Sequence, residues 1–279
     1  MFSVAAEPAM WSEQSLVTAS IVVSALLALV VNAALLLAVF SNRQMLDHFV
    51  LIYSAYIVNN MLCSLSYIYR RVIRLIFINN IYLSYMEKWK CHLLFDILFY
   101  AETNYCFFVF TIFTIRFLAI YCPEKFPTFT KKHALGFLGL QFSTCILICS
   151  LSYTNLDFEN RIYCLIDDVP ANPLIAFISG CLMFALLIIS ILLFTWSLYN
   201  IRLNRADGQQ QIHGVQRIAL LTGVFLTFRV LTFLSEGVAL FILMKDQPTA
   251  SRERIVSVVM LILALGKMFE PIILIIRQT

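Results

Sequence analysis

Residues 91–121 read C-H-L-L-F-D-I-L-F-Y-A-E-T-N-Y-C-F-F-V-F-T-I-F-T-I-R-F-L-A-I-Y, an apolar run with a cysteine at its start and an arginine near its end. Twenty-five residues separate Cys91 from Arg116. At about 1.5 Å of rise per residue, a helix holds these two residues roughly 37 Å apart, close to the thickness of a bilayer with part of its interfaces. The run therefore predicts a membrane-spanning helix with a thiol at one end and a guanidinium at the other.

The composition extends this prediction to the whole chain. Of the 279 residues, 61% are hydrophobic and 13% are charged, which is too apolar for a water-soluble domain of this length. The net charge of +4 is small and scattered, so we expect no nucleic-acid partner. The sequence has no cysteine or histidine cluster at metal-ligand spacing and no nucleophile beside a base. We therefore expect an integral membrane protein that is not an enzyme and uses no metal or cofactor.

Apolar segments long enough to cross a bilayer recur seven times along the chain. We predict an all-α membrane protein, one domain over residues 1–279 that forms a seven-transmembrane helix bundle. Seven spans place the two termini on opposite sides of the membrane. The lysines and arginines divide almost evenly between the two sets of joints, so they do not decide the orientation. The predicted helices cover approximately residues 16–40, 47–76, 91–122, 134–154, 173–201, 216–244 and 252–276.

Glu102 is the acidic residue near the middle of residues 91–121. An ionised carboxylate at mid-depth costs about 2.5–3.5 kcal/mol on insertion scales and therefore needs a partner. Arg229 lies at the corresponding depth of the sixth segment, so we predict a Glu102–Arg229 ion pair. Either this pair holds a resting state and a ligand competes for one partner, or it is a static link that is costly to break whatever the function. A charge-swap variant that folds but does not signal would favour the switch.

Residues 91–121 resemble the third helix of rhodopsin-like G-protein-coupled receptors, which a cysteine opens outside and Asp-Arg-Tyr closes inside. Arg116 matches the arginine, and Ile115 stands where the acidic neighbour belongs. Residues 225–231, F-L-T-F-R-V-L, are similar to the helix-six motif Phe-x-x-Cys-Trp-x-Pro, with Arg229 in place of the tryptophan. Glu270-Pro271 is similar to the helix-seven Asn-Pro. The many departures from the family motifs resemble those of invertebrate chemosensory receptors.

The resemblance implies a disulfide between Cys91 and Cys164, each of which lies just outside an apolar run. Such a bond needs an oxidising compartment, which would put the N-terminus outside the cell and the protein in the plasma membrane. The alternative is two thiols near a membrane surface. The other six cysteines lie in or beside apolar runs, where reduced thiols are expected to pack as small hydrophobic groups. They are Cys63, Cys106, Cys122, Cys145, Cys149 and Cys181.

The resemblance also implies three groups of functional residues. Asn32 and Asn60 are separated by 28 residues, similar to the family's helix-one asparagine and sodium-binding aspartate, although buried asparagines also simply join helices. Lys267 and Glu270 would complete this sodium-pocket equivalent, with the lysine ammonium in place of the ion. Residues implied to line a ligand cavity, or else to pack as core, are Phe99, Glu102, Arg229, Thr232, Phe233 and Glu236. Residues implied to contact a G protein are Arg116, Tyr121, Lys131 and Lys132.

The second predicted helix ends in a basic cluster formed by Arg70, Arg71 and Arg74, whose spacing places them on one helical flank that faces outward along the helix axis. They would contact lipid phosphates or attract an anionic ligand to the cavity. The expected function is a receptor for an extracellular ligand that signals through a heterotrimeric G protein from the lipid bilayer. The alternative is a small transporter or channel whose intramembrane charges line a polar path.

Overall fold

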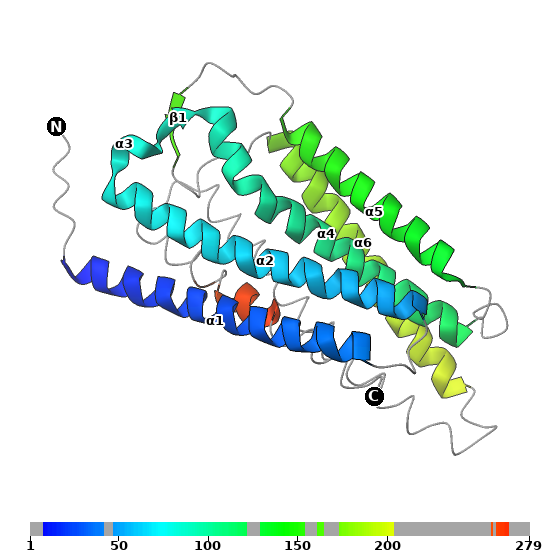
Figure 1. The fold of residues 1–279 in the computed structure, drawn as a ribbon. Helices are drawn as coiled ribbons and strands as arrows, with labels where there is room; N and C mark the ends of the chain where they lie inside the picture. Colours follow the sequence, from blue (N-terminus) through cyan, green and yellow to red (C-terminus); the bar gives the residue numbers. More distant parts are fainter. Residues whose placement is uncertain are drawn as a thin grey trace.

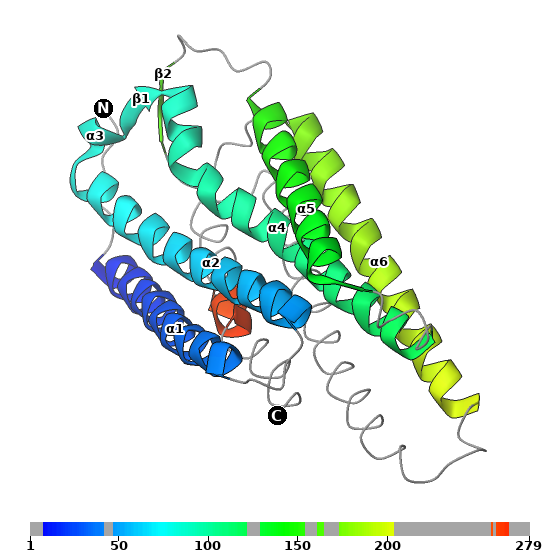
Figure 2. The same ribbon diagram turned by 45° about the vertical axis from the view of Figure 1, so that its right-hand side comes forward.

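The structure is a computed structural model that describes residues 8–41, 47–121, 129–153, 161–164, 173–203, 258 and 261–267. Almost all of these residues are helical, and the long helices lie side by side along one direction (Figures 1 and 2). The segment 261–267 is also helical. The long helices are α1 (Pro8–Ser41), α2 (Asp47–Asn79), α4 (Lys88–Tyr121), α5 (Lys131–Ser152) and α6 (Pro173–Leu203).

Each long helix covers a predicted apolar segment, with ends that differ by a few residues. The first helix begins at Pro8, where the prediction began at residue 16, and the third predicted helix begins at Lys88 instead of residue 91. The fourth begins at Lys131 because Thr130 precedes it with a cap, in which the backbone N–H of Thr130 donates to Nδ1 of His133 at 3.1 Å. The predicted helix 216–244 lies outside the described residues.

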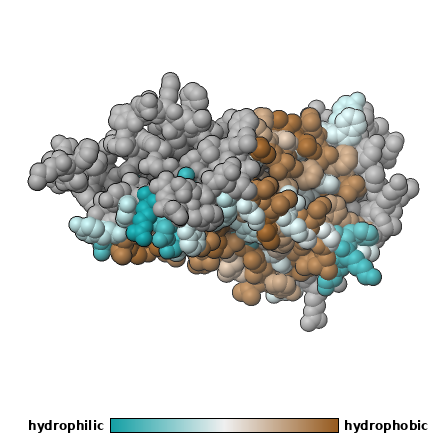
Figure 3. Space-filling view, turned by 90° about the horizontal axis from the view of Figure 1, so that it is seen from above, coloured by the Kyte–Doolittle hydropathy of each residue, from teal (hydrophilic) through white to brown (hydrophobic). Residues whose placement is uncertain are grey.

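Four helices of the described part of the chain are long and apolar enough to cross a membrane. A fifth is added if the two parts of α4, which meet at a bend of 44°, form one span. Large apolar side chains face outward, such as Leu140 at 69% exposure and Val30 at 68%. Hydrophobic residues cover much of the described face in Figure 3, and hydrophilic residues gather toward its ends. These features are those of a membrane protein.

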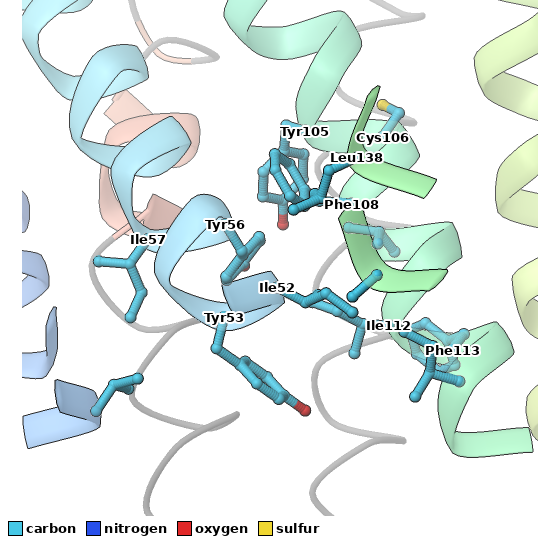
Figure 4. Packing of buried hydrophobic residues seen from close by; sticks show 14 of the residues in the cluster. Ile52, Tyr53, Tyr56, Ile57, Tyr105, Cys106, Phe108, Ile112, Phe113 and Leu138 are labelled. Atoms are coloured by element: carbon cyan, nitrogen blue, oxygen red, sulfur yellow. The ribbon is translucent and has the colours of Figure 1, made fainter. Parts of the chain in front are cut away.

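Helix α2 lies between α1 and α4, and α4 contacts α5 and α6 on its other side (Figures 1 and 2). The largest core cluster joins α2, α4 and α5 through aromatic rings. Tyr56 packs against Tyr105 and Phe108, with ring centroids 5.8 and 6.0 Å apart, and Phe108 contacts Phe142 at 6.1 Å. Figure 4 shows Tyr56 of α2 close to Tyr105 and Phe108 of α4. This packing fixes α4 against its neighbours at the depth of the candidate site.

A second cluster brings residues 261–267 against α1, α2 and α4. Its buried members include small residues, which let helix backbones approach closely. Tyr67 of α2 is the largest side chain of the cluster and is 2% exposed. The other buried members are Ile21, Ala25, Cys63, Ala101, Leu263 and Ala264.

One end of the bundle carries short elements that were not predicted, in the two segments 77–90 and 155–172 between predicted helices. These are α3 (Ile81–Ser84), β1 (Tyr85–Glu87) and β2 (Arg161–Tyr163), the two strands being antiparallel. Glu87 forms an ion pair with Lys90 and approaches Arg161 of β2 at 3.6 Å. The hydrogen bond from Lys90 is the main cause that lowers the pKa of the Glu87 carboxyl. Strands of three residues are too short to show an alternating pattern.

Candidate functional site

Cys91 and Cys164 form a disulfide, with their Cα atoms 5.6 Å apart. The bond joins the first turn of α4 to the residue after β2, and the backbone N–H of Cys164 donates to the carbonyl of Ser84 at 2.7 Å. The predicted disulfide is thus confirmed, and we call this side of the molecule the disulfide end. Five of the other cysteines are thiols, as expected, and Cys122 lies outside the described residues. The thiols are Cys63, Cys106, Cys145, Cys149 and Cys181.

Deeper along α4, Glu102 forms a buried ion pair with Lys267. The Nζ atom of Lys267 lies 3.1 Å from Oε2 of Glu102. The lysine side chain is 1% exposed and the glutamate side chain 19% exposed, so the ammonium is enclosed while the glutamate side chain keeps a small accessible surface. Two opposite charges in a membrane interior are tolerated when they neutralise each other, which explains why these residues meet.

Two tyrosines complete the surroundings of this pair. The hydroxyl of Tyr67 donates to Oε1 of Glu102 at 2.5 Å, so both oxygens of the carboxylate have a partner. The ring of Tyr105 lies beneath the ammonium of Lys267, with Nζ 3.2 Å from the ring centroid. A ring face attracts a cation electrostatically. Glu102 and Tyr105 are three residues apart and therefore share a face of α4. We call Tyr67, Glu102, Tyr105 and Lys267 the charged site.

Asn32 of α1 holds the backbone of Lys267. Its Nδ2 atom donates to the carbonyl of Lys267 at 3.0 Å and to the carbonyl of Ala28 at 2.7 Å. Asn32 is fully buried, which makes each of these hydrogen bonds well shielded from water. The deep asparagine of the first segment therefore holds the helical segment that carries Lys267.

A chain of buried amides runs beside the charged site and joins α2, α4 and α5. Asn59 donates to the carbonyl of Ala101 at 2.9 Å and accepts from Asn104 at 2.9 Å. The Nε2 atom of Gln141 donates to Oδ1 of Asn104 at 2.7 Å, and Thr111 donates to Oε1 of Gln141 at 3.3 Å. Asn104 is the central member, since its side chain bonds to both neighbouring helices. We did not predict this chain, and Gln141 is a polar residue within an apolar run that could have indicated it.

Replacing Asn104 by leucine is expected to lower the free energy of unfolding by about 1–2 kcal/mol, because each interhelical hydrogen bond in a membrane contributes on average about 0.6 kcal/mol. The change also leaves polar atoms of Asn59 and Gln141 without this partner. The measurement is thermal unfolding of the purified variant. The control is Thr144→Val, which removes an exposed hydroxyl that bonds only to the carbonyl of Leu140 in its own helix. Equal midpoints for the two variants would contradict a linking role.

The sodium-pocket equivalent is described only in part. Asn60 is fully buried, and the hydroxyl of Ser64 donates to its backbone carbonyl at 2.9 Å. Within the described residues, no hydrogen-bond partner contacts the side-chain amide of Asn60. Lys267 lies in the charged site, and Glu270 lies outside the described residues. The interpretation of Asn60, Lys267 and Glu270 as one pocket therefore stays a prediction.

The predicted ligand cavity shares only Glu102 with the charged site. Phe99 is half-buried one turn nearer the disulfide end. The other predicted cavity residues lie outside the described residues, so the Glu102–Arg229 pair also stays a prediction. Lys267 was predicted to substitute for sodium, and its contact with Glu102 was missed although both residues are charged and deep in their segments. The cavity residues outside the described part are Arg229, Thr232, Phe233 and Glu236.

All three arginines of the basic cluster lie on α2, and their exposure differs. Arg71 is 7% exposed, whereas Arg70 and Arg74 are half-buried. Arg71 follows Tyr67 by four residues, so it lies on the buried face of α2 that also carries Tyr67. The burial of Arg71 was not predicted, because spacing alone shows which residues share a face and does not show which face is buried. A contact of the basic cluster with lipid phosphates or with an anionic ligand stays a prediction.

The residues predicted to contact a G protein lie at the end of the bundle opposite the disulfide. Arg116 and Tyr121 belong to the last turns of α4, and their backbones are helical. Lys131 and Lys132 are exposed in the first turn of α5. Their contact with a partner stays a prediction.

Two comparisons with known sequences found no match. No protein-family model matches the chain. No curated protein matches it at a significant level. A functional conclusion must therefore come from the chemistry of the residues, above all from the disulfide and the charged site on α4.

Proposed function

We propose that this protein is a seven-helix receptor of the plasma membrane that binds an extracellular ligand and signals through a heterotrimeric G protein. The observation that carries the proposal is the arrangement along α4. A disulfide holds its first turn, a buried ion pair follows farther along, and Arg116 lies near its far end. This order along one helix supports a receptor in which α4 connects the two sides of the membrane.

The disulfide supports the orientation in this proposal. Disulfides persist in oxidising compartments, so the disulfide end would face outward and the N-terminus of the chain would lie outside. The opposite end would then face the cytosol with Arg116, Lys131 and Lys132. These positive groups suit an interaction with an acidic or polar surface of a G protein.

The charged site supports a ligand-sensing role for the middle of the bundle. Charged residues inside a membrane are costly and commonly mark functional sites. An ion pair can also take two states, paired or separated, and a ligand that binds one partner shifts the balance between them. We infer that the Glu102–Lys267 pair stabilises the resting arrangement of α4 against residues 261–267, and that ligand binding changes it.

The protein is expected to show raised basal activity. In the receptor family that the chain resembles, an acidic residue beside the helix-three arginine restrains that arginine. Here Ile115 occupies the position of the acidic residue, and it is 4% exposed within the apolar core. Cells that display the protein at their surface should therefore show second-messenger levels several-fold above those of cells with empty vector. Equal levels, with surface display confirmed, would contradict this expectation.

Purified protein in proteoliposomes separates a receptor from a transporter or channel. When these proteoliposomes lack G protein, a receptor produces no substrate flux or current. Flux that is lost in Glu102→Gln would instead support transport along the intramembrane charges.

A further inference from the structure

We propose that Glu102, Tyr67 and Tyr105 form a binding site for an organic ammonium group, which Lys267 occupies in this structure and which an external primary amine can enter by competing with it. The inference names the ligand class of the proposed receptor and in that respect rests on the proposed function. The site itself can be tested without any signalling.

The contacts of the Lys267 ammonium are those that recognise an organic cation. Its Nζ atom lies 3.1 Å from a carboxylate oxygen of Glu102 and 3.2 Å from the ring centroid of Tyr105. A carboxylate supplies the opposite charge, and an aromatic face attracts the cation without competing for its protons. A desolvated site with both groups holds an ammonium more strongly than either group alone.

The walls of this site do not belong to the segment that carries Lys267. Tyr67 comes from α2, and Glu102 and Tyr105 come from α4. The Tyr67 hydroxyl holds one carboxylate oxygen, and Tyr105 packs against Tyr56. Lys267 enters from residues 261–267, whose backbone Asn32 holds from α1. Removing the lysine side chain should therefore leave the walls in place.

The exposure of the two charged side chains indicates which charge an incoming ligand should carry. The Glu102 side chain is 19% exposed and the Lys267 side chain 1% exposed, so the accessible part of the ion pair belongs to the residue that carries the negative charge. An anion that approached it would meet a like charge, whereas a cation would meet its counter-charge. In Lys267→Ala, an external ammonium restores the positive charge that the substitution removes beside the carboxylate, which avoids a net charge at this depth.

The test uses Lys267→Ala and the amine that replaces the lost atoms. Alanine keeps Cβ, so n-propylammonium supplies the three missing carbons and the ammonium. In lipid nanodiscs, n-propylammonium chloride should raise the unfolding midpoint of this variant by a few degrees, because a ligand that binds only the folded state stabilises it. Sodium chloride and sodium propionate at the same ionic strength should leave the midpoint unchanged. In the unsubstituted chain the amine must displace Lys267, so a much higher concentration is expected for the same effect.

Two further variants test whether Glu102 and Tyr105 bind the amine. The double variant Lys267→Ala with Glu102→Gln should lose the stabilisation by the amine. Adding Tyr105→Leu to Lys267→Ala should weaken amine binding roughly 2- to 30-fold, the range expected for the loss of a cation–π contact. Unchanged amine affinity in both variants would show that the amine binds elsewhere and would overturn the proposal.

A folded Lys267→Ala protein whose midpoint does not respond to n-propylammonium would also overturn it. If Lys267→Ala is recovered unfolded, the amine is added during membrane insertion, and recovery of folded protein becomes the measurement. Recovery with the amine and not with sodium supports the site, and failure to recover overturns it. A failed G-protein assay leaves these stability measurements unaffected, so the two proposals can fail separately.

Discussion

Replacing Lys267 by methionine is expected to lower the free energy of unfolding by about 3–5 kcal/mol, the usual cost of removing one partner of a buried ion pair. The ion pair with Glu102 measures 3.1 Å, and the lysine side chain is 1% exposed. Methionine keeps most of the volume, so the loss comes mainly from the charge that remains on Glu102. The measurement is the unfolding midpoint in detergent or lipid together with the yield of folded protein.

The double variant Lys267→Met with Glu102→Gln should recover most of this loss, because it removes both charges together. The matched control is Lys131→Met, which removes an exposed lysine at the start of α5 and should change stability by less than about 0.5 kcal/mol. The double-mutant cycle isolates the interaction between the two residues. Single variants whose effects simply add in the double variant would contradict a stabilising pair.

Removing the disulfide by Cys91→Ser with Cys164→Ser is expected to cost about 4 kcal/mol in the chain-entropy treatment. The two cysteines are separated by 73 residues, and the loop that they close contains α5. A membrane restricts the unfolded chain, which makes this figure an upper value. The bond also holds β2 against β1, so its loss should release the disulfide end while the amide chain deeper in the bundle stays formed.

The matched control for the disulfide is Cys181→Ser, which changes an exposed thiol of α6. It should leave the unfolding midpoint unchanged. The measurement compares both variants with the unsubstituted protein, with and without reductant. Reductant should lower the midpoint of the unsubstituted protein to that of the double serine variant, and a midpoint insensitive to reductant would contradict a stabilising bond.

The long helices could be predicted because apolar runs of bilayer length have few alternatives in a chain this hydrophobic. The disulfide could also be predicted, since Cys91 and Cys164 lie outside such runs and match the cysteines of a resembling family. The need for a partner at Glu102 followed from the cost of a buried carboxylate. The helices and the need for a partner at Glu102 follow from composition and from position along an apolar run, both of which can be read from a sequence.

The rotation of each helix about its axis could not be predicted. The depth of Arg229 in its predicted helix made it a suitable partner for Glu102. Depth alone does not show which side chain points to this carboxylate, so the contact with Lys267 was missed. For the same reason, the burial of Arg71 on α2 was not predicted. The amide chain through Asn104 was missed because its members lie on three helices, so that no spacing within one segment indicates it.

Receptor function is tested directly by guanine-nucleotide exchange on a purified heterotrimeric G protein. The protein is reconstituted in nanodiscs and compared with empty nanodiscs and with Arg116→Ala, whose folding is verified by its unfolding midpoint. We expect exchange above that of empty nanodiscs for the unsubstituted protein and a return to that level for Arg116→Ala. Equal exchange in all three preparations, tested across the G-protein classes, would contradict a receptor function.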